Sequence, residues 1–390
     1  MITIANPNLQ MAPISILLSA GEASGDMYAA RLATALQQRA DVKVFGMGGP
    51  QMRAAGVDIV TDYSEVSVVG ITEILSHLPS LIRAMRRLVR EAERRQPTLA
   101  VLTDFPGFHL RLARKLKARK IRNAYYICPQ FWAWRPWRVR IVRRRFAQAL
   151  CIFPFEEKFY ADAGVPVKFI GHPLVGNVHP SVDRPTFLRE QNLDPAQPVV
   201  AVLPGSRRAE LHQHLPTLRE ACARIHAVTR AQFVIAAAPH TNNTTLREGW
   251  RPDLPIRIVE GRTYDALAHS DAAIVSSGTA TVETALLDVP MVVVYRVTPL
   301  TAMLAKPLVR TPFFSMVNLI AGKRVVPELI QSDFTPERVA KEVVQLLRDP
   351  TAREAMRANL AEVRNRLGPP GAVDRAADAI LQLIRQSTRP

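Results

Sequence analysis

Residues 272–295 read AAIVSSGTATVETALLDVPMVVVY, and this stretch decides the fold class. A short apolar run, a Ser-Ser-Gly-Thr turn, a helix-compatible segment, a proline and a β-branched run predict a strand–loop–helix–strand unit. Gly278 permits a tight turn, and Thr279 and Thr281 are expected to cap the helix, leaving its first N–H groups free to face an anion. Glu283, one turn further on, can accept hydrogen bonds from ribose hydroxyls. The alternative is an ordinary βαβ unit whose glutamate complements the helix dipole.

The chain opens with the same alternation. A strand, a helix over 27–39 and a second strand are predicted within residues 14–45, which is a parallel α/β start. The turn AGEASGD lacks the GxGxxG pattern and the P-loop lysine, so it indicates neither a usual NAD site nor a usual ATP site. Glu22, Ser24 and Asp26 can instead contact a sugar hydroxyl or a phosphate. The alternative is a plain capping turn, with Ser24 or Asp26 as the cap.

The second half restarts in the same way. A helix is predicted over 212–229, and strands are predicted at 199–203, 233–238, 256–259 and 272–275. In the turn PGSRRAEL, Gly205 and Ser206 offer backbone and hydroxyl donors, and Arg207 or Arg208 offers a cation for a phosphate. The two halves therefore predict two Rossmann-type α/β units, joined by the proline-containing stretch that follows residues 171–174.

An aspartate ends the strand predicted at residues 99–103. Asp104 precedes a Pro-Gly turn at the carboxyl end of this strand, where open α/β sheets collect ligands. It is the best candidate for a general base in the first half, because a fixed carboxylate can accept a proton from an attacking hydroxyl. His109 can orient Asp104 or compete for its role, and a turn-forming aspartate is the alternative.

Positive charge dominates the chain, with a net charge of +17 at pH 7. Seven of the twelve residues from Arg111 to Arg122 are basic, and six arginines lie between Arg135 and Arg145, close to three tryptophans. Nucleic acid and an anionic membrane surface both fit such a face, and a solvated helix face is the third option. Residues 78–89 add an amphipathic helix, which faces either a core or a membrane.

The apolar runs and the cysteines indicate which classes of protein this chain does not resemble. No apolar run approaches the roughly 20 residues that span a bilayer, and the first apolar run reads as a strand, not as a signal peptide. The three cysteines lie far apart without a CxxC pair, which indicates a reduced cytoplasmic protein without disulfides or structural zinc.

Eight stretches in order resemble the lipid-A-disaccharide synthase family. They are AGEASGD (20–26), TDFPGFH (103–109), CPQFWAWR (128–135), FIGHPL (169–174), LPGSRRAEL (203–211), GTATVETAL (278–286), YRVTPLTAMLAK (295–306) and NLIAGKRVVPELIQ (318–331). The resemblance runs through nearly the whole chain. It departs at His109, where asparagine is expected, at Thr103, where isoleucine is usual, and at Met316-Val317, where Leu-Pro is common.

This resemblance implies a fold and a reaction. The fold is GT-B, with two Rossmann-like domains facing across a cleft: residues 1–180 with about 370–390 on the acceptor and membrane side, and residues 190–369 binding the nucleotide sugar. The reaction is an inverting transfer of 2,3-diacylglucosamine from UDP to the 6-hydroxyl of 2,3-diacylglucosamine 1-phosphate. Its products are UDP and a β(1→6) disaccharide phosphate, and no cofactor or metal is implied.

The resemblance also implies roles for single residues. Asp104 is the implied base, and the implied substrate-binding positions are Glu22, Ser24, His109, Arg207, Gly278, Thr279, Glu283 and Asn318. The implied location is the cytoplasmic face of the inner membrane, with the arginine- and tryptophan-rich face against anionic lipid and with no nucleic-acid partner. A homodimer is compatible with these expectations.

Two rival functions remain open at this stage. One is another UDP-sugar enzyme of the same architecture, such as a lipid-linked N-acetylglucosaminyltransferase or a UDP-sugar 2-epimerase. The other is a basic RNA-binding protein on a degenerate scaffold.

Overall fold

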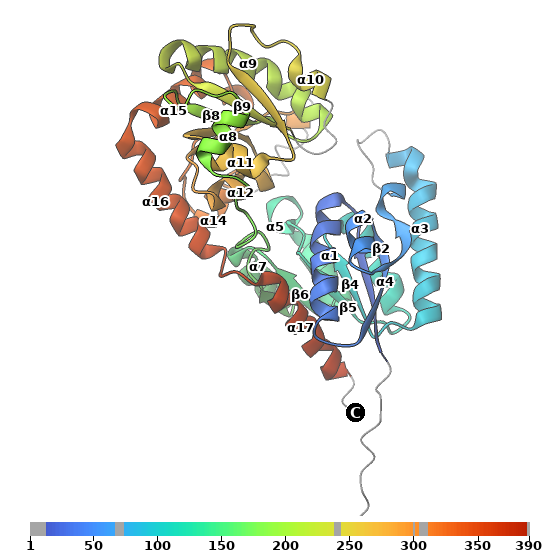
Figure 1. Ribbon diagram of the computed structural model, residues 1–390. Coiled ribbons are helices and arrows are strands. Elements are labelled where there is room, and N and C mark those ends of the chain that lie inside the picture. Colours follow the sequence, from blue (N-terminus) through green and yellow to red (C-terminus); the bar gives the residue numbers. More distant parts are fainter. Residues whose placement is uncertain (1–12, 67–73, 238–242, 299–300, 304–310, 388–390) are drawn as a thin grey trace, which may run out of the picture. The chain divides into compact units, whose positions relative to one another are not determined.

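Two parallel sheets carry the fold in the computed structural model, which describes residues 13–66, 74–237, 243–298, 301–303 and 311–387 (Figure 1). Two compact units divide the chain. The first comprises Met1–Phe131, Arg135–Pro173 and Gly371–Pro390, and the second comprises Trp132–Trp134 and Leu174–Pro370. Parts of two stretches singled out in the sequence, 66–74 and 295–306, lie outside the described residues.

The first unit is built on a parallel sheet that has seven strands in the described part of the chain, in the order β3-β2-β1-β4-β5-β6-β7. The strands are β1 (Ile14–Ala20), β2 (Val42–Gly48), β3 (Asp58–Asp62), β4 (Leu99–Thr103), β5 (Asn123–Tyr126), β6 (Gln148–Cys151) and β7 (Val167–Phe169). The central strands β1 and β4 are buried along nearly their whole length, as expected where helices cover both faces of a parallel sheet.

Helices cover this sheet on two sides. They are α1 (Ala23–Gln37), α2 (Pro50–Ala54), α3 (Ile74–Arg95), α4 (Pro106–Lys117), α5 (Phe131–Trp134), α6 (Val139–Arg145), α7 (Pro154–Asp162) and α17 (Ala372–Ser387), with short 3₁₀ turns η1 (Tyr63–Glu65) and η2 (Pro136–Arg138). Apolar residues of α3, α4 and α6 share one core with alternate strand residues. On the other side α17 packs against α1, and Arg39 forms ion pairs with Asp374 and Asp378 (Figure 1).

The second unit repeats the plan with a parallel sheet that has six strands within the described ranges, in the order β10-β9-β8-β11-β12-β13. The strands are β8 (Val199–Leu203), β9 (Gln232–Ala237), β10 (Ile256–Glu260), β11 (Ala272–Ser276), β12 (Met291–Tyr295) and β13 (Glu328–Ile330). Its helices are α8 (Arg184–Glu190), α9 (Arg208–Thr229), α10 (Asn243–Arg247), α11 (Thr263–Ala268), α12 (Thr279–Leu286), α14 (Met316–Ala321), α15 (Pro336–Arg348) and α16 (Pro350–Arg366), with the 3₁₀ turn η3 (Gln331–Asp333).

The alternative interpretation of the first turn, in which Ser24 or Asp26 caps the helix that follows, is wrong. Helix α1 begins at Ala23, and its N-cap Glu22 makes no side-chain cap hydrogen bond. Asp26 lies inside α1, is 1% exposed and accepts hydrogen bonds from the backbone N–H groups of Gly49, Gln51 and Met52. Asp26 therefore caps α2, a neighbouring helix, because its carboxylate supplies the acceptor that the first turn of a helix lacks.

Among the described residues, no helix combines the length and the apolar character needed to cross a bilayer.

Candidate active site

Both sheets reverse their strand order at one central pair. In the first unit the reversal lies between β1 and β4, and in the second it lies between β8 and β11. Loops that leave the carboxyl ends of such a pair diverge, so ligands of open α/β sheets bind there. The predicted site residues Glu22, Ser24 and Asp104 follow β1 and β4, and Gly278, Thr279 and Arg207 follow β11 and β8.

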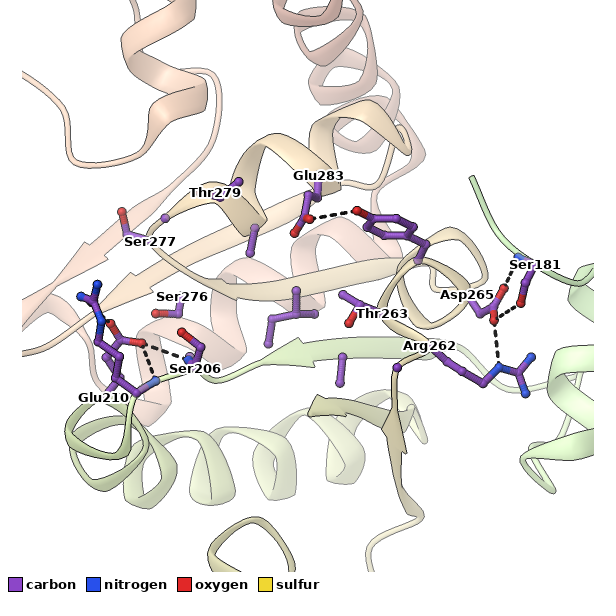
Figure 2. A pocket seen from close by; sticks show the side chains of 18 of the residues that line it. Ser181, Ser206, Glu210, Arg262, Thr263, Asp265, Ser276, Ser277, Thr279 and Glu283 are labelled. Atoms are coloured by element: carbon purple, nitrogen blue, oxygen red, sulfur yellow. Dashed lines mark hydrogen bonds and ion pairs between the residues drawn. The ribbon is translucent and has the colours of Figure 1, made fainter. Parts of the chain in front are cut away.

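A pocket of about 610 Å³ opens at the reversal point of the second unit. The carboxyl ends of β8, β9 and β11 line it, together with residues 261–265 between β10 and the first turn of α11 and the start of α12. Figure 2 shows Ser206 and Glu210 at one end of the pocket and Ser181, Arg262 and Asp265 at the other. Four of the predicted site residues line this pocket: Arg207, Gly278, Thr279 and Glu283.

The turn at Gly278 begins helix α12. Gly278 has φ 158° and ψ −159°, a backbone region that residues with a Cβ rarely adopt. The prediction that Thr279 and Thr281 cap this helix is wrong, because Gly278 is the N-cap and the Thr281 hydroxyl donates a hydrogen bond to the Gly278 carbonyl. No side chain of the described residues caps the first turn, which leaves a helix N-terminus of positive partial charge facing the pocket.

Arg207 lies at the opposite wall, at the start of α9. Its side chain is 71% exposed, and its guanidinium lies 3.8 Å from the Glu210 carboxylate. The backbone N–H groups of Ser206 and Arg207 both donate hydrogen bonds to Glu210 Oε2, over 3.0 and 3.3 Å. The Ser206 backbone N–H, predicted as a phosphate donor, is therefore engaged within the protein, whereas the Arg207 guanidinium is exposed at the pocket.

Glu283 faces the pocket from the second turn of α12 (Figure 2). Its Oε1 accepts a hydrogen bond from the Tyr264 hydroxyl over 3.1 Å. Burial raises the pKa of Glu283, and the hydrogen bond from Tyr264 opposes that shift. A half-buried carboxylate held in this way is a suitable acceptor for ligand hydroxyls.

Ser276 is a pocket residue that was not predicted from the sequence. It ends β11, is 6% exposed and lines the pocket, yet its hydroxyl has no hydrogen-bond partner among the described residues. Buried hydroxyl groups are normally paired, and this unpaired one belongs to a residue of the pocket wall. A polar residue at the end of an apolar strand, just before the Gly278 turn, was the available signal in the sequence.

Asn318 lies away from this pocket. It is fully buried in α14, and its Oδ1 accepts hydrogen bonds from the backbone N–H groups of Val325 and Val326. Its Nδ2 donates to the Val326 carbonyl and to Glu328 Oε1. The side chain therefore fixes the loop between α14 and β13.

Asp104 follows β4 at the reversal point of the first unit, and its side chain is half-buried. Its pKa is raised to about 6, chiefly because burial penalises the charged form and secondly because Glu22 is negatively charged, while a hydrogen bond from the Phe105 backbone opposes the shift. A carboxyl group with this pKa is mostly ionised at neutral pH and still basic enough to take a proton. Glu22, the N-cap of α1, and Ser24, in the first turn of α1, are both exposed.

His109 is fully buried and does not compete with Asp104 for a proton. Its Nδ1 lies 2.8 Å from the Asp104 carbonyl oxygen, and its Nε2 lies 2.8 Å from Ser19 Oγ. Burial lowers the pKa of His109 to about 4, so the ring is neutral at physiological pH. It contacts the backbone of Asp104 and not its carboxylate.

Within the described part of the chain, no group of three or more His, Cys, Asp or Glu side chains is arranged to hold a metal ion.

Comparisons with known proteins agree with the resemblance noted in the sequence. The family model described as lipid-A-disaccharide synthetase matches residues 16–376. Lipid-A-disaccharide synthase of Solibacter usitatus (strain Ellin6076) is 47% identical over 371 residues, which cover 95% of this chain and 97% of the relative. The synthase of Myxococcus xanthus (strain DK1622) is 45% identical over 377 residues, which cover 95% and 98%.

Solved structures show the fold. The calicheamicin glycosyltransferase CalG4 has a TM-score of 0.61 at 17% identity and covers 97% of this chain and 100% of its own. The UDP-GlcNAc 2-epimerase from Neisseria meningitidis bound to UDP-GlcNAc has a TM-score of 0.61 at 11% identity, with 96% and 100% covered. The expected GT-B architecture of two Rossmann-like domains is confirmed, and the chain belongs to the lipid-A-disaccharide synthase family of glycosyltransferases.

Proposed function

We propose that this enzyme transfers 2,3-diacylglucosamine from UDP to the 6-hydroxyl of 2,3-diacylglucosamine 1-phosphate, with inversion. The products are the β(1→6) disaccharide 1-phosphate and UDP. In this proposal the second unit binds the nucleotide sugar and the first unit binds the acceptor. The observation that carries the proposal is Asp104, a half-buried carboxylate at the strand-order reversal of the first sheet, with a pKa raised to about 6.

The nucleotide part of the donor is assigned to the pocket of the second unit. Departure of UDP leaves negative charge on the pyrophosphate, which must be neutralised as it develops. The N-terminus of α12 at Gly278 and Thr279 and the exposed guanidinium of Arg207 are suited to this task. Glu283 is assigned to the ribose hydroxyls, because a half-buried carboxylate accepts hydrogen bonds from vicinal hydroxyls.

The acceptor is assigned to the loops after β1 and β4. Asp104 takes the proton of the 6-hydroxyl as its oxygen attacks the anomeric carbon of the donor, a contribution typically worth about 10²- to 10⁴-fold in rate. Glu22 and Ser24 lie at the start of α1, directly after β1, and are assigned to acceptor hydroxyls. Asn318 and His109 are assigned indirect roles, because both are fully buried and bonded within the protein.

A membrane surface accounts for the exposed apolar residues of the first unit. In α3 the expected apolar stripe divides: Met85, Leu88 and Val89 are buried in the core, whereas Leu78 and Ile82 are 49% and 42% exposed. A helix that leads into a parallel strand starts at the carboxyl edge of the sheet, which is also the edge of Asp104. We assign these side chains to the acyl region of the inner leaflet.

Positive charge lies on the same unit. The pKa of Arg138 is lowered, first by burial and then by the charges of Arg135 and Arg111, so three guanidinium groups lie close together. Trp137 beside them is 54% exposed. This combination fits anionic headgroups and peripheral binding to the cytoplasmic face of the membrane.

One experiment tests the reaction. Purified enzyme in detergent micelles is given UDP-2,3-diacylglucosamine and 2,3-diacylglucosamine 1-phosphate, and UDP release and the linkage of the product are followed. We expect a β(1→6) product, and Asp104→Asn is expected to lose at least about 100-fold in kcat while UDP binding is unchanged. Release of UDP without acceptor, or epimerised UDP-sugar as the product, would favour a different GT-B enzyme.

A further inference from the structure

A strained backbone carries the carboxylate of Asp104. Asp104 has φ 48° and the next residue, Phe105, has φ 47°, so two consecutive residues with a Cβ adopt the left-handed region. Such residues are uncommon singly and persist only where the surroundings hold them. These two residues form the turn that connects the end of β4 to the start of α4.

Hydrogen bonds to the backbone of Asp104 hold this conformation. The Asp104 carbonyl oxygen accepts from His109 Nδ1 over 2.8 Å and from the Tyr125 hydroxyl over 2.9 Å. The Asp104 N–H donates to the Tyr126 carbonyl, so its backbone is fixed on both sides. The Phe105 ring lies against Gly21, where an added Cβ would be 2.2 Å from it.

The geometry also fixes the tautomer of His109. A carbonyl oxygen only accepts, so Nδ1 must carry the proton that bonds it, and Nε2 is then the acceptor in the neutral ring. The Ser19 hydroxyl, on β1, therefore donates to Nε2 over 2.8 Å. A chain of hydrogen bonds runs from Ser19 on β1 through His109 on α4 to the Asp104 backbone at the end of β4.

We propose that Ser19, His109 and Tyr125 are positioning residues that hold the Asp104 backbone in its left-handed conformation and so aim the carboxylate at the acceptor hydroxyl. His109 and Tyr125 bond the Asp104 carbonyl oxygen rather than the carboxylate, and Ser19 acts through His109. The inference rests on the proposed role of Asp104 as the base.

Substitutions at position 109 test the proposal, because the two ring nitrogens have different partners. His109→Asn keeps an amide donor near the position of Nδ1, His109→Gln keeps a polar group near Nε2, and His109→Leu removes both. We expect His109→Leu to lower kcat by about 10- to 100-fold with little change in either KM, since misplacing a reacting group by about 1 Å costs this much. His109→Asn is expected to restore kcat to within about 5-fold of the parent.

The pH profile separates positioning from loss of structure. The titratable groups around the Asp104 carboxyl are Glu22, His109, Tyr125 and Cys128, and Glu22 is the second cause of its raised pKa. A released Asp104 becomes better solvated, so the acid limb of kcat in His109→Leu should move below its parent position near pH 6. Ser19→Ala and Tyr125→Phe serve as milder variants, which keep the test valid if His109→Leu does not fold.

A double substitution distinguishes this proposal from the proposed function. In an Asp104→Asn background, His109→Leu should cause no further loss of rate, because there is no base left to aim. An equal loss in both backgrounds, or an unchanged kcat and acid limb in folded His109→Leu, would overturn the positioning role. High activity of Asp104→Asn alone would instead overturn the base assignment.

Discussion

The Tyr264 hydroxyl and the Glu283 carboxylate form a hydrogen bond of 3.1 Å across the pocket of the second unit. Tyr264 belongs to α11, after β10, and Glu283 belongs to α12, after β11. The bond therefore joins two helices that follow strands on the two sides of the strand-order reversal. It fixes the direction of the carboxylate before a ligand arrives, which lowers the ordering cost of binding.

Removing this carboxylate should weaken donor binding. We expect Glu283→Ala to raise the donor KM by about 10- to 100-fold, the usual range for a hydrogen bond to a charged group, with a smaller change in kcat. Tyr264→Phe should raise the donor KM by about 2- to 10-fold, because only the orientation of the Glu283 carboxylate is lost. Tyr63→Phe, in the first unit, is the control and should leave the donor KM unchanged. An unchanged donor KM in Glu283→Ala would contradict the assignment of Glu283 to the ribose.

The rate should depend on pH through Asp104. Its pKa is raised to about 6 and the base acts when deprotonated, so kcat should fall as pH drops through 6. Glu22→Gln removes the negative charge that is the second cause of the shift, so the acid limb should move to lower pH. The measurement is kcat against pH at saturating substrates. An acid limb that stays in place in Glu22→Gln would show that another group controls it.

The raised pKa of Asp104 also predicts how the thermal stability of the protein depends on pH. The pKa of Asp104 rises from 3.8 to about 6 on folding, so the folded state favours the protonated form, and ionisation destabilises it as pH rises through this window. Asp104→Asn should therefore melt about 2 to 4 °C higher than the parent at pH 8, and the difference should be much smaller at pH 4. Thermal melts at both values check this, and equal melting temperatures at pH 8 would mean that the ionised carboxylate is not strained by burial.

The parallel sheets and the reversal points could be read from the sequence. Apolar, β-branched runs such as residues 272–276 and 291–295 leave little choice but buried strands, and the Gly-containing turns after them mark strand ends. The position of Asp104 directly after a strand could be predicted from the neighbouring residues in the sequence alone. The three-residue strand β13 was missed because it is too short to show a period.

Long-range hydrogen bonds could not be predicted. Asp26 looked like a cap for its own helix and instead caps α2, whose amide groups lie more than twenty residues away. Glu210 takes the backbone N–H groups that the turn at Ser206 seemed to offer to a phosphate. In both cases the residue type was informative, but its partner depended on how separate elements pack.

Arg207 and its neighbour Arg208 offer a matched test of the phosphate assignment. Both are exposed, but only Arg207 lines the pocket. Arg207→Ala should weaken UDP binding by about 10- to 100-fold, and Arg208→Ala should leave it within about 2-fold, as measured by calorimetry. The pair of Arg207 with Glu210 is largely exposed, so the melting temperature should not change. Equal losses in the two variants would indicate a diffuse electrostatic effect.

Membrane binding is tested at the start of α3. Leu78 and Ile82 are exposed apolar side chains of the first unit, and Val228, 49% exposed on α9, is a comparable residue of the second unit. Burial of one such side chain in lipid is worth about 1.5 to 3 kcal/mol, so Leu78→Ser with Ile82→Ser should reduce binding to phosphatidylglycerol vesicles by at least about tenfold. Val228→Ser should bind as the parent does.

The exposed arginines Arg143 and Arg144 allow a parallel test by substitution with glutamine. Arg145 is not suitable for this test, because its guanidinium donates a hydrogen bond to the Leu110 carbonyl and supports the fold. Co-sedimentation measures all variants, and unchanged vesicle binding, or binding of single-stranded RNA that the same substitutions abolish, would contradict a membrane role for this helix.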